Sequence, residues 1–299
     1  MAALALSSAA FAQTTEAIPP GWKTCPHCLS NQEIKNEAKF YVPGMPYNPR
    51  DISGVWNVLP PESNLMGAQN AFAKDQKNTG VVPPNVPPFT PYGKQLFDAT
   101  MTGFKAPEGT AVTNSKDPML KCDPLGWPRW WTYNYGTEFV TLNDRVIEFI
   151  EWGHTFRTIW TDGRKLPDNP PENRFLGWSI GHWEPDDTFV IESTGFDDRS
   201  WISEAANAAS IPGAKGWGTH AWPHSDQMKV AERWKRTSYG TLQSQLTVID
   251  PKVYTKPWTT DVYTFNLLPD TEIWEYFCVP SDSNYFNEKV IQPSNGGTR

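Results

Sequence analysis

The spacing of hydrophobic and polar residues in the second half of the chain is typical of β-strands. Between Val146 and Trp160, apolar residues recur at every second position, and β-branched and aromatic residues are frequent. Alternation with a period of two indicates a strand with one buried face. The pattern therefore predicts one extended strand, whose inner face carries Val146, Ile150, Trp152, Phe156 and Trp160, with His154 among them.

Three further pairs of strand-like segments are each joined by a short turn sequence. They are 178–183 with 188–193, 227–236 with 242–249, and 258–268 with 272–279. Successive hairpins predict an antiparallel meander rather than alternating strands and helices. Closing such a meander into a barrel removes its two unpaired edges. We therefore expect an all-β fold, an antiparallel meander closed into a barrel, with an open two-sheet sandwich as the alternative.

The region before these strands has a different composition. Residues 60–125 are rich in Pro, Gly and Asn, which favour turns and polyproline conformations over sheet. A short helix is expected from Pro91 to Thr100, because Tyr92, Leu96 and Phe97 share one helical face. We expect this long Pro-rich N-terminal segment to wrap over the barrel as a lid or brace.

The first twelve residues form an apolar run that ends in Ala10-Phe11-Ala12, which fits a signal-peptidase site. We interpret residues 1–12 as a signal peptide remnant, although a short buried helix is the alternative, and expect a periplasmic or secreted protein. Residues 13–50 are expected to be irregular, 51–282 to form a single β-barrel domain, and 283–299 to form a C-terminal tail. No other stretch approaches the ~18 apolar residues of a membrane span.

The charge balance excludes one class of partner. The formal net charge is -7, from 26 Lys and Arg against 33 Asp and Glu. Nucleic-acid binding needs a basic face that displaces counterions from phosphates, and no cluster of Lys or Arg supplies one. We therefore expect no nucleic-acid partner and no membrane span.

Four cysteines suit an oxidising compartment. Cys122 and Cys278 flank segments that look ordered, and we expect a disulfide between them, which would close a long loop. Cys25 and Cys28 form a C-x-x-C pattern without the strand and helix that surround a thioredoxin-type site. A local structural disulfide is the expectation for this second pair. Redox catalysis and a weak metal site that uses His27 are the alternatives.

Glu232 is a polar residue on the apolar side of its predicted strand, because it shares parity with Trp234. Burial of a carboxylate among apolar neighbours raises its pKa. A histidine beside it could exchange a proton with it near neutral pH, and His154 is the candidate. A structural hydrogen bond to Arg157 or Arg233 is the alternative.

A second group of candidates lies in loops. His220 and His224 belong to an aromatic-rich loop, residues 217–226, which leads into the Glu232 strand. Loops of this kind over a cavity commonly supply ligand contacts. Asp198 and Arg199 follow another strand. Our favoured interpretation is an exposed salt bridge there, and the competing one places an Asp at the mouth, where it orients His224 or a water molecule.

Several phrases resemble a largely uncharacterised family of exported bacterial proteins that look like lipocalins. One is Gly54-Val55-Trp56, which is similar to the G-x-W that opens lipocalin barrels. The others are Pro88-Phe89-Thr90-Pro91, Cys122-Asp123-Pro124-Leu125-Gly126-Trp127-Pro128-Arg129, residues 151–164, Ser193-Thr194-Gly195-Phe196, Pro223-His224-Ser225 and Glu232-Arg233. The resemblance implies one domain, export and a lipocalin-like barrel, and it brings no settled reaction.

Together these patterns predict a barrel that binds a small hydrophobic or aromatic molecule and transforms it by acid/base chemistry without a cofactor. Lyase, isomerase and hydrolase reactions all fit. We expect His154 or His224 as base, Glu232 as partner or acid, and Arg157 or Arg199 as stabiliser of negative charge. Substrate contacts are expected from Trp152, Phe156, Trp178, Trp222, Trp234, Asp198 and Arg199.

Two alternatives to this prediction stay open. A metal site built from the histidines is allowed, but no spacing among them indicates one, so no metal is expected. A non-catalytic carrier of a small hydrophobic ligand is the alternative to an enzyme, and in a carrier the polar residues would only orient the ligand.

Overall fold

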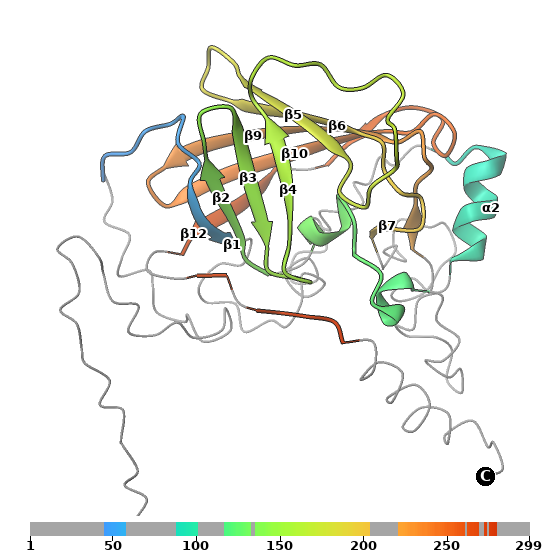
Figure 1. The fold of residues 1–299 in the computed structure, drawn as a ribbon. Helices are drawn as coiled ribbons and strands as arrows, with labels where there is room; N and C mark the ends of the chain where they lie inside the picture. Colours follow the sequence, from blue (N-terminus) through green and yellow to red (C-terminus); the bar gives the residue numbers. More distant parts are fainter. Residues whose placement is uncertain are drawn as a thin grey trace, which may run out of the picture.

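The computed structural model describes residues 45–57, 88–100, 117–132, 135–203, 221–260, 262–268, 272–273 and 275–279. Within these residues, nine strands close into a β-barrel (Figure 1). In the order in which they follow one another around the barrel, they are β1 (Gly54–Asn57), β2 (Thr137–Thr141), β3 (Arg145–Ile150), β4 (Thr155–Trp160), β5 (Trp178–Trp183), β6 (Phe189–Thr194), β9 (Lys229–Ser238), β10 (Thr241–Ile249) and β12 (Tyr263–Leu267). The prediction of a closed all-β barrel is confirmed.

Neighbouring strands of the barrel are antiparallel except for one pair. β4 and β5 run parallel, with Ile159 opposite Ser179 and Trp160 opposite Ile180. An odd number of strands cannot alternate in direction around a closed ring, so one parallel pair is required. A parallel pair also needs a long connection, which residues 161–177 supply. The prediction of an entirely antiparallel meander is therefore wrong at this pair.

The segment predicted as one strand from Val146 to Trp160 is a hairpin. β3 ends at Ile150 and β4 begins at Thr155. Gly153 and His154 between them have φ angles of 70° and 47°, in the left-handed region that reverses the chain.

The turn also shifts the alternation of side chains in β4. Val146 and Ile150 of β3 are buried as predicted, but in β4 it is Arg157 that is buried. Phe156 is 59% exposed. The predicted inward orientation of Trp152, His154, Phe156 and Trp160 is therefore wrong, because it assumed an unbroken strand.

Aromatic side chains pack the barrel interior. The Trp131 ring lies 3.9 Å from that of Tyr263 and 6.1 Å from that of Phe265. The Trp234 ring lies 5.2 Å from that of Phe139 and 5.1 Å from that of Phe265. These rings occupy space that the sequence pattern assigned to a ligand, so Trp234 is a core residue.

Short elements complete the described part of the chain. They are α2 (Pro91–Ala99), the 3-10 helices η3 (Pro118–Lys121) and η4 (Arg129–Thr132), and the strands β7 (Trp201–Ser203), β8 (Trp222–Pro223) and β11 (Trp258–Thr259). α2 matches the predicted helix, and the Thr90 hydroxyl caps it by accepting a hydrogen bond from the Gly93 amide. The Phe97 ring of α2 lies 5.9 Å from that of Trp222 in β8, which anchors the helix beside the barrel (Figure 1).

Cys122 and Cys278 form a disulfide, which confirms that prediction. The bond secures residues 275–279 near the β3–β4 turn, where Trp152 forms an isolated bridge with Tyr276. The signal peptide remnant, Cys25, Cys28, His220, most of the Pro-rich segment and the tail 283–299 lie outside the described residues. In the part that is described, no helix is long and apolar enough to cross a membrane.

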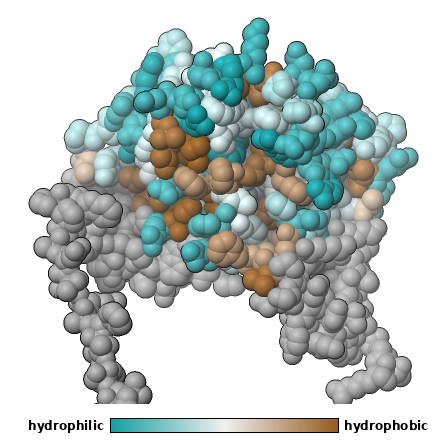
Figure 2. All heavy atoms as spheres, viewed as in Figure 1, coloured by the Kyte–Doolittle hydropathy of each residue, from teal (hydrophilic) through white to brown (hydrophobic). Residues whose placement is uncertain are grey.

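The outer surface of the barrel is not uniformly polar. Figure 2 shows apolar residues gathered on the face that carries β2, β3 and β4, among hydrophilic residues. The exposed Phe156 ring on β4 lies 5.9 Å from the ring of Phe149 on β3.

Candidate active site

His224 lies just after β8, in the loop that leads into β9, and is almost completely buried. Its Nδ1 is 3.1 Å from the carbonyl oxygen of Ser225, and its Nε2 is 2.8 Å from the hydroxyl oxygen of Ser200. A carbonyl can only accept, so Nδ1 carries the hydrogen. Nε2 then presents its lone pair to the Ser200 hydroxyl, whose single hydrogen lies between this nitrogen at 2.8 Å and the carbonyl oxygen of Asp197 at 3.1 Å.

The tautomer of His224 is fixed by a carboxylate further along the chain. Asp250, buried at the end of β10, accepts hydrogen bonds from the Ser225 amide at 2.6 Å and from the Ser225 hydroxyl at 2.8 Å. It also accepts a hydrogen bond from the amide of Val253. The turn after His224 is therefore held by the barrel strand β10. This turn contains the Ser225 carbonyl, which orients the imidazole of His224.

Burial sets the protonation state of His224. Desolvation lowers the pKa of its imidazole below the usual 6.5, although the charges of Asp250, Asp198 and Asp197 oppose this. The imidazole is therefore neutral at pH 7, the form that can take up a proton.

Ser200 is positioned by a turn between β6 and β7. The Asp197 carboxylate accepts hydrogen bonds from the Arg199 amide at 3.0 Å and from its guanidinium at 2.7 and 2.9 Å. Gly126 packs directly against Ser200, since a Cβ at this glycine would lie 2.5 Å from the hydroxyl oxygen. Its φ of 76° favours glycine as well, so both conformation and space require glycine beside the hydroxyl.

A cavity of about 320 Å³ lies next to this pair. His224, Asp198, Arg199 and Asp123 supply its ionisable groups, and Leu96, Trp201 and Pro223 are among its apolar walls. Pockets for small molecules commonly have roughly this size and mixture of groups. Residues from α2, from the loop after η3, and from the segments around β7 and β8 thus meet at one site.

Three sequence-predicted residues, His224, Asp198 and Arg199, therefore lie together around one cavity. The two interpretations of the Asp198-Arg199 segment, an exposed salt bridge and an Asp at the mouth of a cavity, both have a structural counterpart. Arg199 forms an ion pair with Asp197 and is largely exposed, while Asp198 is at the cavity.

A second cluster of charges is buried inside the barrel. The Arg157 guanidinium donates two hydrogen bonds of 2.7 Å to the Glu232 carboxylate and a further short one to Glu148. Trp234 Nε1 donates to Glu232 at 2.9 Å, and the ring of Trp127 lies 3.8 Å from the guanidinium carbon. Glu232 faces inward as predicted, and the alternative of a structural hydrogen bond to Arg157 is confirmed, whereas the expectation of a histidine partner is wrong.

Glu148 is the carboxyl of this cluster whose pKa lies near neutral pH. Burial raises the pKa of its carboxyl to about 7, against the opposing charge of Arg157 and with a further rise from Glu232. For Arg157, burial lowers the pKa, but the two carboxylates outweigh this and hold it above its usual value.

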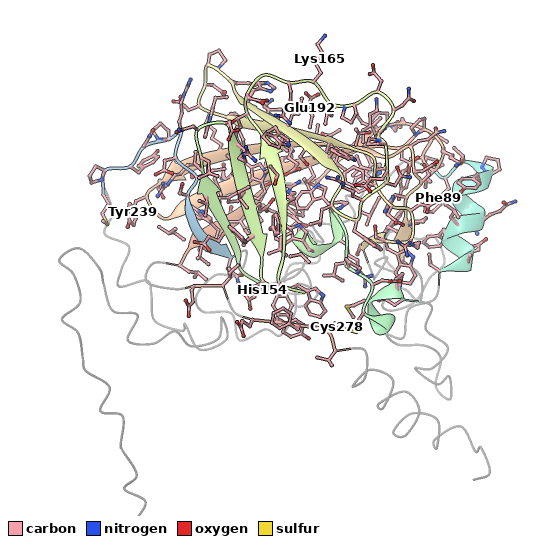
Figure 3. The ribbon with its side chains drawn as sticks, viewed as in Figure 1. Phe89, His154, Lys165, Glu192, Tyr239 and Cys278 are labelled. Carbon is pink, nitrogen blue, oxygen red and sulfur yellow. A yellow bond between two sulfur atoms is a disulfide. The ribbon has the colours of Figure 1, made fainter. Side chains whose placement is uncertain are left out.

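His154 and Trp152 do not reach either cluster. His154 is exposed in the β3–β4 turn, and its ring lies 5.2 Å from that of Phe277, at the end of the barrel where Cys278 lies (Figure 3). Trp152 is half-buried between the rings of Tyr135 and Tyr276.

The remaining predicted contacts are dispersed over the molecule. Trp222 packs against Phe89 and Phe97. Phe156 and Trp178 line a different cavity, on the outer side of the barrel wall. The sequence-predicted residues thus divide among four places instead of one hollow: the cavity beside His224, the buried cluster of Arg157, the β3–β4 turn and the cavity lined by Phe156.

Sequence reasoning missed Ser200, Asp250, Asp123 and Glu148. Glu148 shares parity with Val146 and Ile150, so the alternation of β3 already contained a signal for it. Asp123 belongs to the phrase that begins at Cys122. Ser200 and Asp250 contact the site only through the folded structure. Among the described residues, no group of three or more His, Cys, Asp or Glu is arranged to hold a metal ion.

Comparisons with known proteins do not extend these findings. No family model, no curated protein and no solved structure matches the chain.

Proposed function

We propose that this chain is an exported enzyme that transforms a small molecule with an apolar or aromatic body by proton transfer at His224. The observation that carries the proposal is the 2.8 Å hydrogen bond between Ser200 and a buried, neutral His224 beside a cavity of about 320 Å³. A hydroxyl next to an oriented base is the arrangement from which proton transfer is efficient.

The chemistry follows from the fixed tautomer. In the proposed relay, the substrate in the cavity lined by His224 reaches the buried Ser200 beside it. The Ser200 oxygen takes a proton from the substrate while its own proton passes to Nε2 of His224, which becomes imidazolium. Asp198 and Asp250 favour that cation, since both charges raise the pKa of His224. Arg199 at the cavity stabilises negative charge that develops on the substrate. Return of the proton to another atom of the substrate completes an isomerase cycle, and its delivery to the departing group completes a lyase cycle. In a hydrolytic cycle the proton comes instead from a water molecule that attacks the substrate, and it is delivered to the leaving group.

Export is part of the proposal. The disulfide between Cys122 and Cys278 supports it, because disulfides persist in oxidising compartments outside the cytosol. The apolar start of the chain, with its Ala10-Phe11-Ala12 sequence, points the same way.

The test is turnover by purified protein with a panel of aromatic and terpenoid alcohols, esters and ketones, followed by mass spectrometry. His224→Asn and Ser200→Ala should each lower the rate by roughly a hundredfold or more, because each removes one member of the relay. His154→Asn is the matched control. It replaces an exposed histidine at a φ of 47°, which Asn tolerates, and should keep the full rate. Equal rates in all three variants would contradict the site.

The pH profile provides a second check. Because the pKa of His224 is lowered, the neutral base persists below the usual 6.5. The rate should therefore be level near pH 8 and fall at acidic pH with a midpoint below 6.5. A midpoint above pH 7 would contradict a buried neutral histidine as the base.

A carrier of a small hydrophobic ligand is the second candidate. It is favoured by the fact that both imidazole nitrogens of His224 already have partners within the protein. Saturable quenching of tryptophan fluorescence by panel compounds, with every compound recovered unchanged, would support the carrier over the enzyme.

A further inference from the structure

The wall of the barrel opens between β4 and β5. These strands pair only through Ile159 and Trp160 at the end of β4 and through the first residues of β5. The first half of β4 has no partner strand on this side among the described residues. A cavity of about 510 Å³ occupies the space between it and the 161–177 crossover, and this cavity shares no lining residue with the one beside His224.

Part of this cavity is apolar. The Phe156 side chain faces it from β4 and is 59% exposed, which is unusual for a large ring on an otherwise paired strand. Leu166, Pro167 and Leu176 come from the crossover on the other side. An exposed apolar patch inside a cavity indicates contact with an apolar ligand.

The ionisable residues that line the cavity are all cationic: Arg157, Arg164, Lys165 and Arg174. This contrasts with the net charge of -7 for the whole chain. Arg157 is buried and already engaged by two glutamates, while Lys165 extends into solvent from the crossover (Figure 3). Arg164 and Arg174 are therefore the cations that can meet a ligand.

Both arginines are held in place but retain donors. Arg164 binds Asp162 through Nε and Nη2, and its guanidinium carbon lies 3.5 Å from the centre of the Trp160 ring. Arg174 binds Glu172 through the same two atoms and lies 3.5 Å from the Trp178 ring. The Nη1 group of each arginine has no hydrogen bond to any described residue.

From these contacts we infer that the cavity between β4 and the crossover is a binding site for a small aromatic carboxylate. The planar body packs on Phe156 and Leu176, and the carboxylate accepts hydrogen bonds from the remaining donors of Arg164 and Arg174. Guanidinium groups bind carboxylates through parallel hydrogen bonds, and stacking on the tryptophans keeps both cations oriented before the ligand arrives. The site is separate from the proposed active site and does not depend on it.

The test uses 2-naphthoate and its neutral counterpart 2-naphthalenemethanol as probes, titrated into the full chain by isothermal calorimetry. Naphthoate should bind at one saturable site, at least tenfold more tightly than the alcohol, and its affinity should fall as salt rises. The double variant Arg164→Met/Arg174→Met should weaken naphthoate binding at least tenfold and leave the alcohol unaffected. Phe156→Ser should weaken both probes.

Arg199→Met is the matched control. Arg199 is paired with an Asp two residues earlier through the same Nε and Nη2 atoms, but it lines the cavity beside His224. It should leave naphthoate affinity unchanged. The inference is overturned if naphthoate does not saturate, if the double variant binds it like the wild type, or if Arg199→Met is the variant that weakens binding.

Discussion

Arg157 carries one positive charge between two carboxylates in the interior of the barrel. Both Glu148 and Glu232 are fully buried, so the cluster would have a net negative charge if both were ionised. Uncompensated charge in a low-dielectric interior is costly, and a carboxyl avoids that cost by binding a proton. The raised pKa of Glu148, about 7, identifies it as the group that holds this proton.

This cluster predicts a pH dependence of stability. The folded-state pKa of Glu148 lies above its unfolded value, so the folded protein binds the proton more tightly, and the free energy of unfolding falls as pH rises toward 7. Glu148→Gln removes this dependence. The free energy of unfolding of the variant minus that of the wild type should therefore rise by about 2 kcal/mol from pH 5 to pH 8, as measured by urea unfolding.

Glu192→Gln is the control for that measurement, because Glu192 is an exposed carboxyl on β6 (Figure 3). The free energy of unfolding of Glu192→Gln should change with pH in the same way as that of the wild type. Parallel curves for the wild type and Glu148→Gln would show that the buried carboxyl is ionised throughout.

At the level of elements, β5, like β4, has one parallel and one antiparallel neighbour. Gly181 of β5 leaves space for side chains from both neighbouring strands, β4 and β6. A Cβ there would lie 2.5 Å from the Phe189 ring of β6 and 2.9 Å from the Ile159 side chain of β4. The absence of a side chain lets these two residues meet in the core.

Gly181→Ala should therefore destabilise the protein by about 1–3 kcal/mol, the usual cost of overpacking a core. His182→Ala, at the exposed neighbouring position, should change the free energy of unfolding by less than about 0.5 kcal/mol. Urea unfolding at one pH compares the two variants. Equal losses would mean that the β5 backbone moves to accommodate the methyl group.

The strands show which parts of the fold follow from local pattern. The hairpins around 184–188 and 239–240 were predictable, because their turn residues interrupt clean alternation. The β3–β4 turn was not, because Trp152 continues the apolar pattern through it. Gly153 was the remaining signal there. The parallel pairing of β4 with β5 depends on strand number around the ring, which no local window contains.

The same distinction applies to the candidate site. His224, Asp198 and Arg199 could be nominated from residue type and loop position. Ser200 and Asp250 could not, because their roles depend on hydrogen bonds between segments distant in sequence. His154 failed for a local reason, since one misplaced turn inverted its predicted orientation.

For the whole molecule, the disulfide connects the segment before η4 to the C-terminal segment 275–279. Cys122 and Cys278 are separated by 156 positions in the sequence. In the chain-entropy account, a cross-link over so long a loop strongly restricts the unfolded state. The rings of Tyr276 and Phe277 contact Trp152 and His154 at the β3–β4 end of the barrel, and the disulfide keeps the segment that carries them close to this end.

Cys122→Ser/Cys278→Ser should therefore lower the free energy of unfolding by roughly 3–5 kcal/mol. Amide hydrogen exchange should rise first in residues 275–279 and in the β3–β4 turn, and β9 and β10 should stay protected. Unchanged exchange at the turn would mean that ring contacts alone hold the C-terminal segment.

Closure of the barrel joins the two ends of the described domain, since Trp56 of β1 pairs with Leu267 of β12. The ring is therefore incomplete until the chain has been synthesised as far as Leu267. Folding that waits for such distant partners is slow. Until then the folding intermediate has two sheet edges with unpaired backbone groups, and we expect it to be prone to aggregation at this stage.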